Sequence, residues 1–188
     1  MELKCLALAC SPRKEGNTAL LAGRAIEACL AAGCRTEFLY LADYRYLPCC
    51  VCEGCYTTGR RVVKDDAGLI FDKILAADRL ILAAPVFSMG ICVQAKMFID
   101  RAQQFWAAKY ILGKDLIVDQ ERPARRGIFD GVIQVARYFF KILEINLTGT
   151  LCYTGVDKKG DILKNTATLE EAYRFGQKLS EGNPAQHL

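Results

Sequence analysis

The sequence has a single histidine among its 188 residues, and this residue, His187, lies next to the C-terminus. A histidine-based catalytic triad or a histidine-rich metal site therefore has almost nothing to build on. An excess of charge of one sign is also missing, because 25 Lys and Arg residues against 21 Asp and Glu residues leave a net charge of +4. So small an excess gives no reason to expect nucleic acid as a partner.

Long hydrophobic runs are absent as well. The longest uncharged stretch lies between Arg79 and Lys96, and Pro85 and Gly90 interrupt it, so it is too short and irregular to cross a bilayer. The apolar segment at the N-terminus is too short for a secretory signal. We therefore expect a cytoplasmic protein that binds no membrane and keeps its ten cysteines mostly reduced.

The composition is that of a globular protein, and the chain alternates between two patterns. Hydrophobic residues make up 52% of the chain and charged residues 24%, which excludes a chain that is disordered throughout. Short apolar runs predict strands, and apolar side chains at helical spacing predict helices. The expected strands are 3–9, 36–42, 78–84 and 148–154, with a shorter one at 116–118, and the expected helices are 18–32, 67–77, 93–109, 131–143 and 169–179.

Strands that alternate with helices of this length are typical of an open α/β sheet. We expect a single domain over residues 1–188, with a doubly wound, mostly parallel sheet and helices on both faces in a three-layer sandwich. Such sheets bind their ligands at the carboxyl ends of the strands. The loops that follow the first and third strands are therefore the first candidates for a site.

The loop after the first strand carries groups that suit an anion. It offers two hydroxyls, two positive charges and a glycine that lets the backbone approach closely, and the free N–H groups of the next helix point toward it. These residues are Ser11, Arg13, Lys14, Gly16 and Thr18. The glycine spacing fits neither G-x-G-x-x-G nor a P-loop. The alternative is a plain strand-to-helix turn in which Asn17 caps the helix.

The third strand ends in an apolar loop. Pro85 ends the strand, Gly90 permits a tight turn, and Phe87 and Met89 place large apolar groups between them. Apolar groups at this edge suit a flat aromatic ligand that backbone polar groups hold. The alternative is that Phe87 and Met89 pack on the following helix. Together with an anion-binding loop one strand away, this loop predicts a site for an aromatic mononucleotide.

Here the sequence resembles a known family. The segments Ser-Pro-Arg-Lys-Glu-Gly-Asn-Thr at 11–18, Ala-Pro-Val-Phe-Ser-Met-Gly at 84–90 and Lys-Met-Phe-Ile-Asp-Arg at 96–101 are similar to the flavodoxin-like NAD(P)H-dependent FMN reductases. They are most similar to the iron–sulfur flavoprotein branch of that family, which Asp65-Asp66 also fits. The resemblance runs in the same order from residue 3 to about residue 179.

The resemblance implies a bound FMN that NAD(P)H reduces, and it assigns residues to both ends of the cofactor. The phosphate would be bound by Ser11, Arg13, Gly16, Asn17 and Thr18. The isoalloxazine ring would be lined by Pro85, Val86, Phe87, Ser88, Met89 and Gly90. No catalytic side chain is expected, because the flavin does the chemistry. We expect Lys96, Asp100 and Arg101 to be structural.

A cluster of cysteines at residues 49–55 has the spacing of metal ligands. Cys49, Cys52 and Cys55 form C-x-x-C-x-x-C, which can supply three thiolates of a [4Fe–4S] cluster from one loop. Cys50 is a poor fourth ligand, because adjacent residues tend to point apart. Zinc would face the same shortage of ligands. The alternative is a loop that carries thiols but no metal.

The fourth ligand of such a cluster is missing where the resemblance would place it. In the iron–sulfur branch a cysteine follows a few residues later, after a glycine, whereas here Gly59 is followed by Arg60 and Arg61. The remaining candidates are Cys152, a cysteine of another subunit or a group other than cysteine.

The function that these observations favour is an FMN-dependent oxidoreductase that takes electrons from NAD(P)H and passes them to a small acceptor or a redox protein. The runner-up is an iron–sulfur flavoprotein-type electron carrier with a ferredoxin-like donor. A third hypothesis is a flavin-binding redox sensor whose thiols report the oxidation state. The resemblance also favours a homo-dimer or homo-tetramer.

Overall fold

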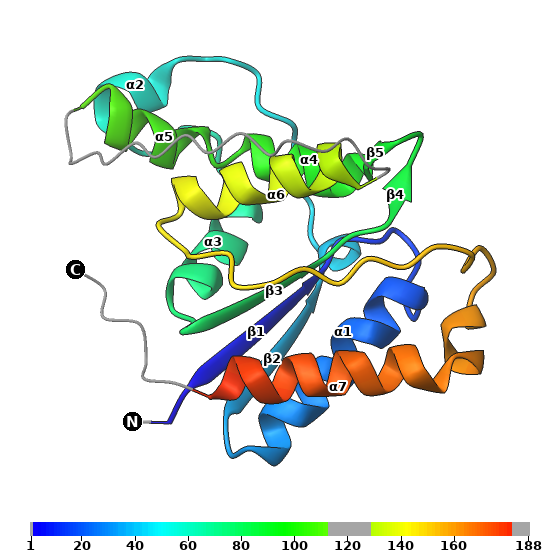
Figure 1. Cartoon of the computed structure of the whole chain (residues 1–188). Helices are drawn as coiled ribbons and strands as arrows, with labels where there is room; N and C mark the ends of the chain where they lie inside the picture. The colour runs from blue at the N-terminus through cyan, green and yellow to red at the C-terminus, as the bar shows by residue number, and fades with distance from the viewer. Residues whose placement is uncertain (1, 113–128, 182–188) are drawn as a thin grey trace. The chain divides into compact units, whose positions relative to one another are not determined.

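The computed structural model describes residues 2–112 and 129–181, shown as a ribbon in Figure 1. The chain divides into two compact units, which are described here one at a time. The first unit comprises residues 1–44, 69–85 and 151–188, and the second comprises residues 45–68 and 86–150. The expectation of a single domain over the whole chain stays a prediction. In the described ranges, none of the helices has the length and apolar character needed to cross a membrane.

The first unit is built on a parallel sheet of three strands. The strands are β1 (Lys4–Ala9), β2 (Arg35–Tyr40) and β3 (Arg79–Ala83), in the order β2-β1-β3. Leu6 of β1 pairs with Glu37 of β2 and with Leu80 of β3. The residues of β1 from Cys5 to Ala9 are fully buried, as expected for a central strand between two neighbours. The first three predicted strands are therefore confirmed.

Helices cover both faces of this sheet, as Figure 1 shows. On one face α1 (Asn17–Ala31) packs against α7 (Thr166–Ser180), and on the other lies α3 (Ala67–Leu75). The backbones of α1 and α7 come very close at Gly176, where an added Cβ would lie 2.0 Å from the Ala25 carbonyl oxygen. Two short 3₁₀ helices, η1 (Leu41–Asp43) and η2 (Asp161–Lys164), complete this unit. The three layers confirm the predicted α/β class.

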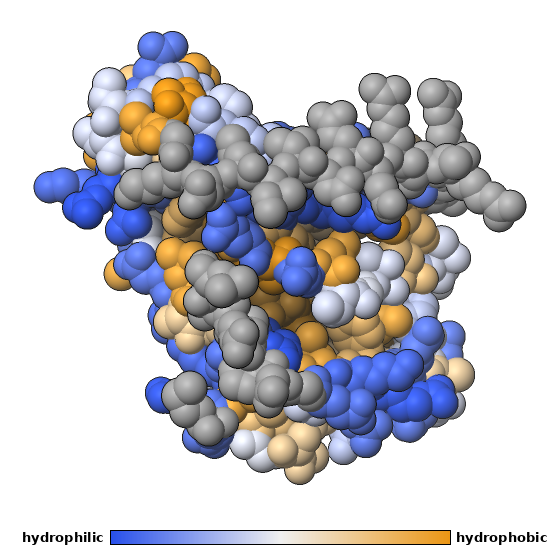
Figure 2. All heavy atoms as spheres, turned by 60° about the vertical axis from the view of Figure 1, so that its left-hand side comes forward, coloured by the Kyte–Doolittle hydropathy of each residue, from blue (hydrophilic) through white to orange (hydrophobic). Residues whose placement is uncertain are grey.

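The second unit is mostly helical. It contains α2 (Gly54–Thr58), a hairpin of β4 (Val86–Phe87) and β5 (Gly90–Ile91), and the helices α4 (Val93–Asp100), α5 (Gln103–Tyr110) and α6 (Asp130–Ile142). In its core the Phe98 ring meets the rings of Tyr46 and Phe139 edge-on, at centroid distances of 5.9 and 6.0 Å. Large apolar side chains of this unit also reach the surface, and Figure 2 shows hydrophobic atoms exposed on the face that it presents.

The predicted helix at 93–109 is two helices in the structure. The Arg101 N–H donates to the Phe98 carbonyl at 3.0 Å and the Ala102 N–H to the Ile99 carbonyl at 2.9 Å. These tight bonds end α4, and α5 begins at Gln103. The break turns the Arg101 side chain into the interior, where it is only 7% exposed. Helical spacing alone does not reveal this break, because apolar residues continue through it.

The prediction of a strand at 148–154 is wrong. Residues 145–154 form neither helix nor strand. A strand needs a hydrogen-bonded neighbour, and none of the described strands pairs with this segment. The other predicted strand, 116–118, lies outside the described residues.

Candidate functional site

The loop between β1 and α1 is a compact turn in the first unit. The Cys10 N–H donates to the Ala83 carbonyl at 2.8 Å, which extends the pairing of β1 with β3 by one residue. The buried Ser11 hydroxyl accepts from the Arg13 N–H at 3.1 Å, and the Gly16 N–H donates to the Arg13 carbonyl at 3.2 Å. A Cβ on Gly16 would lie 3.0 Å from that carbonyl oxygen. A side chain at position 16 would therefore crowd the turn that glycine leaves open.

The helix that follows this loop begins without a side-chain cap. Gly16 occupies the N-cap position of α1, and Asn17 and Thr18 are the first two helical residues. The prediction that Asn17 caps the helix is therefore wrong. A bare helix start leaves N–H groups of the first turn available to a bound anion.

The Asn17 side chain instead holds a distant segment of the same unit. Its amide nitrogen donates to the carbonyls of Val156 and Lys158 at 2.8 and 2.9 Å. Its oxygen accepts from the N–H groups of Gly160 and Ile162 at 3.0 and 3.4 Å. Four bonds use the full donor and acceptor capacity of the side chain. Asn17 therefore fixes residues 156–162 beside the start of α1, and only its backbone N–H remains to serve an anion.

The two positive side chains of the β1–α1 loop differ in their surroundings. Arg13 is exposed. Lys14 forms an ion pair with Asp43, and its ammonium lies 5.7 Å from the centroid of the Tyr40 ring. Glu15 takes a positive φ of 55° and forms an ion pair with Lys159 at 3.0 Å. The positive charge of Lys14 is thus partly neutralised within the protein.

The predicted ring-binding residues begin at Pro85, which belongs to the first unit, and continue into the hairpin of the second unit. Val86 and Phe87 pair antiparallel with Ile91 and Gly90. Ser88 and Met89 form the turn between them, with φ values of 48° and 63°. Positive φ at both central residues is the geometry of a type I′ hairpin, and it is unusual for side chains other than glycine and asparagine.

This turn presents its apolar side chains to solvent. Phe87 is 53% exposed and Met89 is 66% exposed, so more than half of each side-chain surface is open to solvent. An apolar side chain held outward by a strained turn is suited to contact a flat ligand. The β1–α1 loop and this hairpin lie in different units, so the structure describes the two halves of the predicted site separately.

An ion pair that the sequence did not reveal anchors the loop with the cysteines. The Arg101 guanidinium donates to the Asp65 carboxylate at 2.5 Å and to the Leu47 carbonyl at 2.8 Å. The carboxylate also accepts from the N–H groups of Leu47 and Ala67, at 3.0 and 3.2 Å. An aspartate two residues before a helix is the available sequence signal, whereas the arginine partner lies 36 residues away. Lys96 and Asp100, which are four residues apart on α4, form an ion pair at 2.5 Å.

The pKa of Asp65 reflects this setting. Burial is the largest single influence and raises the pKa, but the hydrogen bonds from Arg101, Leu47 and Ala67 and the positive charge of Arg101 outweigh it. The net result is a pKa below the ordinary value for aspartate, so the carboxylate stays ionised at neutral pH.

The cysteine loop, defined here as residues 45–66, carries four cysteines that differ in their exposure. Cys49 and Cys55 are half-buried, whereas Cys50 and Cys52 are exposed. Within residues 2–112 and 129–181 there is no group of three or more His, Cys, Asp or Glu side chains placed to hold a metal ion. Cys152 is exposed and belongs to the other unit. The described donor set thus does not fit a [4Fe–4S] cluster, which needs four thiolates or their equivalents.

Comparison with protein families gives a match over most of the chain. Residues 3–118 match the family model described as NADPH-dependent FMN reductase. An iron–sulfur flavoprotein of Methanocaldococcus jannaschii is 34% identical over 186 residues, which cover 95% of this chain and 96% of that protein. A protein of Bacillus subtilis named as an NAD(P)H-dependent FMN-containing oxidoreductase is 28% identical over 173 residues, which cover 87% and 91%.

Solved structures show the same fold. An NAD(P)H:quinone oxidoreductase from Methanothermobacter marburgensis superposes with a TM-score of 0.62 at 16% identity, covering 97% of this chain and all of that one. At this identity the likeness concerns the fold alone. This likeness agrees with the observed strand order β2-β1-β3, because the flavodoxin-like fold has the strand order 2-1-3-4-5.

Proposed function

The chain belongs to the NADPH-dependent FMN reductase family, and we propose that its β1–α1 loop holds the phosphate of the FMN on which this oxidoreductase depends. The observation that carries the proposal is the compact turn at Gly16, where a Cβ would lie 3.0 Å from the Arg13 carbonyl oxygen. This turn precedes an uncapped helix start, so backbone N–H groups are available to the phosphate. The exposed Arg13 adds a guanidinium, which suits phosphate recognition.

Each predicted phosphate residue then has a separate task. Ser11 is buried and shapes the turn through its bond from the Arg13 N–H. Gly16 lets the backbone come close to the phosphate, and Thr18 contributes a hydroxyl. Asn17 is a positioning residue, because its side chain is fully used in holding residues 156–162.

The flat ring would lie against the turn at residues 85–90. Phe87 and Met89 expose apolar side chains there, and the turn backbone supplies polar groups. When bound, FMN accepts a hydride from NAD(P)H and passes electrons on. The side chains need only orient the cofactor and leave one face open to the donor. The proposal therefore assigns no catalytic acid or base.

The experiment that tests this proposal removes the exposed positive charge of the loop. Arg13→Ala is expected to weaken FMN binding by roughly 10- to 100-fold, the effect of losing a charge-assisted hydrogen bond. The matched control is Lys14→Ala, which removes the neighbouring charge already paired with Asp43 and is expected to change FMN binding much less. Fluorescence titration of the apoprotein with FMN measures both. Equal affinity of Arg13→Ala and the unaltered protein contradicts the proposal.

The electron donor is tested on the purified holoprotein. We expect NADPH or NADH to bleach the flavin absorbance under anaerobic conditions without any other protein. Bleaching that requires a ferredoxin-like donor would instead support the electron carrier. The electron acceptor is proposed to be a small molecule or a redox protein.

We also propose that the chain acts in the cytoplasm as a homo-dimer or homo-tetramer. Its exposed apolar residues, among them Val93 at 61% and Tyr138 at 50%, support a subunit contact. Light scattering coupled to size-exclusion chromatography tests the proposal, and a monomer at micromolar concentration contradicts it.

A further inference from the structure

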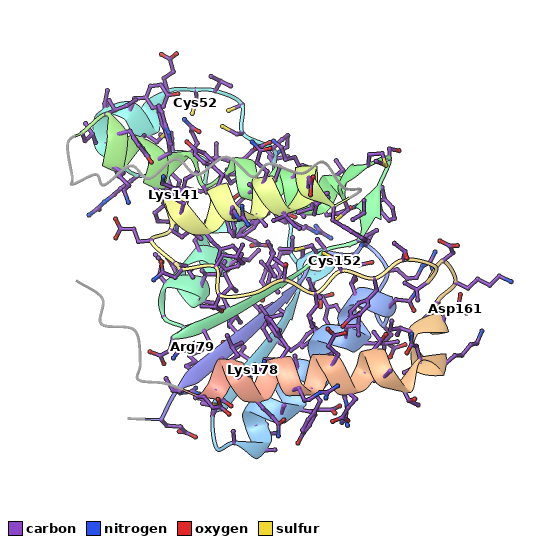
Figure 3. The ribbon with its side chains drawn as sticks, viewed as in Figure 1. Cys52, Arg79, Lys141, Cys152, Asp161 and Lys178 are labelled. Carbon is purple, nitrogen blue, oxygen red and sulfur yellow. The ribbon has the colours of Figure 1, made fainter. Side chains whose placement is uncertain are left out.

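Residues 156–162, here called the latch segment, are tied to the start of α1 from the far end of the sequence. The Asn17 side chain donates to two carbonyls of this segment and accepts from two of its N–H groups, over distances of 2.8 to 3.4 Å. The ion pair of Lys159 with Glu15 is a second, exposed tie between the same two stretches. Figure 3 labels Asp161 at the start of η2, where the latch segment leads toward α7. All of these residues belong to the first unit.

The latch segment holds its shape through its own bonds and through one glycine. The Lys158 N–H donates to the Asp161 carboxylate at 2.9 Å, and the Asp161 N–H donates to the Lys158 carbonyl at 3.1 Å. Ile162 is fully buried and anchors the end of the segment. Gly160 has a φ of 83°, a left-handed conformation that residues with a side chain rarely adopt. The N–H that Gly160 offers to Asn17 therefore depends on a conformation that favours glycine.

The position of Asn17 decides how the latch segment acts on the proposed phosphate loop. Asn17 is the first residue of α1 and lies between Gly16 and Thr18. No side chain caps this helix start, and helix ends fray where nothing holds them. The four bonds of Asn17 to the latch segment hold the first turn in place instead. If the segment opened, the N–H groups of the first turn would lose their fixed direction.

We propose that the latch segment controls the affinity of the β1–α1 loop for the FMN phosphate, and that Asn17 is the positioning residue that couples the two. This inference rests on the proposed phosphate site. The resemblance assigns Asn17 to the phosphate itself, whereas its side-chain amide has its donors and acceptor capacity occupied by the latch segment.

The coupling works through two states of the latch segment. In the closed state Asn17 keeps its four bonds and the first turn of α1 is ready for an anion. In the open state these bonds are broken and the first turn frays, so the apparent affinity falls with the fraction of closed protein. FMN binds the closed state more tightly and therefore stabilises the segment, and the two effects are equal by linkage. Riboflavin has no phosphate, so its binding is expected to respond little to the segment.

Hydrogen exchange on the unaltered full chain tests the coupling without any substitution. The apoprotein is measured alone, with saturating FMN and with saturating riboflavin. The amides of Gly160 and Ile162 report the latch directly, because both donate to the Asn17 side chain. FMN is expected to slow their exchange, and riboflavin is expected to slow it much less. Equal protection by FMN and riboflavin contradicts the proposal.

Gly160→Ala opens the latch segment from the side that the phosphate loop does not share. Alanine is strained at a φ of 83°, so the closed state loses population, and FMN binding is expected to weaken roughly 3- to 10-fold. Riboflavin binding is expected to stay nearly unchanged. The matched control is Gly33→Ala, which has the same φ of 83° but follows the other end of α1. It is expected to lower stability by a similar amount and to leave the ratio of FMN to riboflavin affinity unaltered.

Two further variants examine the ties themselves. Asn17→Ala removes all four bonds and is expected to accelerate exchange at Gly160 and Ile162 and to weaken FMN binding at least as much as Gly160→Ala does. Lys159→Ala removes only the ion pair with Glu15. Its effect is expected to be small, because exposed ion pairs contribute little.

Fluorescence titration of each apoprotein with FMN and with riboflavin supplies the affinities, and Arg13→Ala is measured beside the variants. FMN binding that is weaker in Arg13→Ala but unaltered in Gly160→Ala would overturn the latch and leave the phosphate site standing. FMN binding that is unaltered in Arg13→Ala would contradict the phosphate site instead. Equal losses of FMN and riboflavin affinity in Gly160→Ala would show that the segment supports only the fold, and the proposal would then be wrong.

Discussion

Two sets of three cysteines differ in their surroundings: one is packed in a core, and the other lies on a loop at the surface. In the first unit Cys5 on β1, Cys29 on α1 and Cys34 just before β2 form one packed cluster, here called the core trio. Their exposed fractions are 0%, 0% and 5%. In the second unit Cys49, Cys52 and Cys55 follow one another at three-residue spacing on the cysteine loop, and Cys52 faces solvent. The residue type is the same, so the difference arises from the surroundings.

The core trio is held by packing. Ala7, Ala22 and Ile26 surround it, and the Cys29 thiol donates to the Gly176 carbonyl at 3.4 Å. The hydrogen bond with Cys29 and then burial raise the pKa of the Cys5 thiol, so thiolate is scarce there. Buried thiols of this kind behave as small apolar side chains.

The cysteine loop is held by polar anchors. The Arg101–Asp65 ion pair fixes both ends of the loop, and its side chains are only 6% and 10% exposed. Burial raises the pKa of the Cys55 thiol, its own N–H lowers it, and the neighbouring Cys49 and Cys52 charges raise it again. The comparison teaches that a cluster of thiols becomes chemically available only where polar contacts, and not a core, hold the chain in place.

The comparison is tested most directly by the rate of alkylation. In the reduced native protein, iodoacetamide is expected to modify Cys50 and Cys52 at least 100-fold faster than any member of the core trio. A reagent reaches the trio only after local or global opening, and an opening free energy of about 3 kcal/mol slows modification roughly 100-fold. Timed quenching and peptide mass spectrometry measure the rates. Equal rates at Cys34 and Cys52 would break the contrast between the two groups.

Removing the anchor of the loop is expected to have the next largest effect. Asp65→Asn leaves the buried Arg101 without its counter-charge, and breaking such a pair costs about 3–5 kcal/mol. Urea unfolding measures the change in free energy of unfolding, and faster alkylation of Cys55 than of the core trio shows that the loop opens. Asp66→Asn is the control, because Asp66 accepts one backbone bond, from Arg45 at 2.7 Å, and its loss is expected to cost about 1 kcal/mol.

Crowding the contact between α1 and α7, next to the core trio, is expected to lower the free energy of unfolding by less than Asp65→Asn does. In Gly176→Ala the new Cβ would lie 2.0 Å from a backbone oxygen of α1, so α1 and α7 must separate, at about 1–3 kcal/mol. Alkylation of Cys29 should then accelerate while the cysteine loop is unaffected. The matched control is Gly23→Ala on α1, where nothing lies within 4 Å of the added Cβ and a gain of up to about 1 kcal/mol is expected. Equal stability of the two variants would show that the contact is not tight.

The contrast also separates what the sequence could predict from what it could not. The core trio and its surroundings follow from local patterns, because the apolar runs and the helical spacing identify β1, β2, β3 and α1.

The polar anchors could not be predicted, because their partners are far apart in the sequence. Arg101 and Asp65 are 36 residues apart, and Asn17 reaches carbonyls 139 and 141 residues away. The missing strand at 148–154 is a similar case, because a strand exists only where a neighbouring strand accepts its hydrogen bonds.

Lowering the pH is expected to remove the stabilisation that Asp65 gives the cysteine loop and to leave the packing around the core trio unchanged. This is the smallest of the predicted effects. Because the pKa of Asp65 is lowered in the folded protein, its stabilising contribution is fully present above the ordinary aspartate pKa of about 4 and is lost as pH falls through the lower, folded value. The difference in free energy of unfolding between the unaltered protein and Asp65→Asn should therefore be constant from pH 7 to pH 5 and shrink below about pH 4. Urea titrations of both proteins at each pH measure it, and other carboxylates that titrate in both proteins cancel in the difference. The cost of Gly176→Ala, which involves no ionisable group, should stay constant over the same range. A difference for Asp65→Asn that does not change down to pH 3 would show that the ion pair with Arg101 does not hold the cysteine loop.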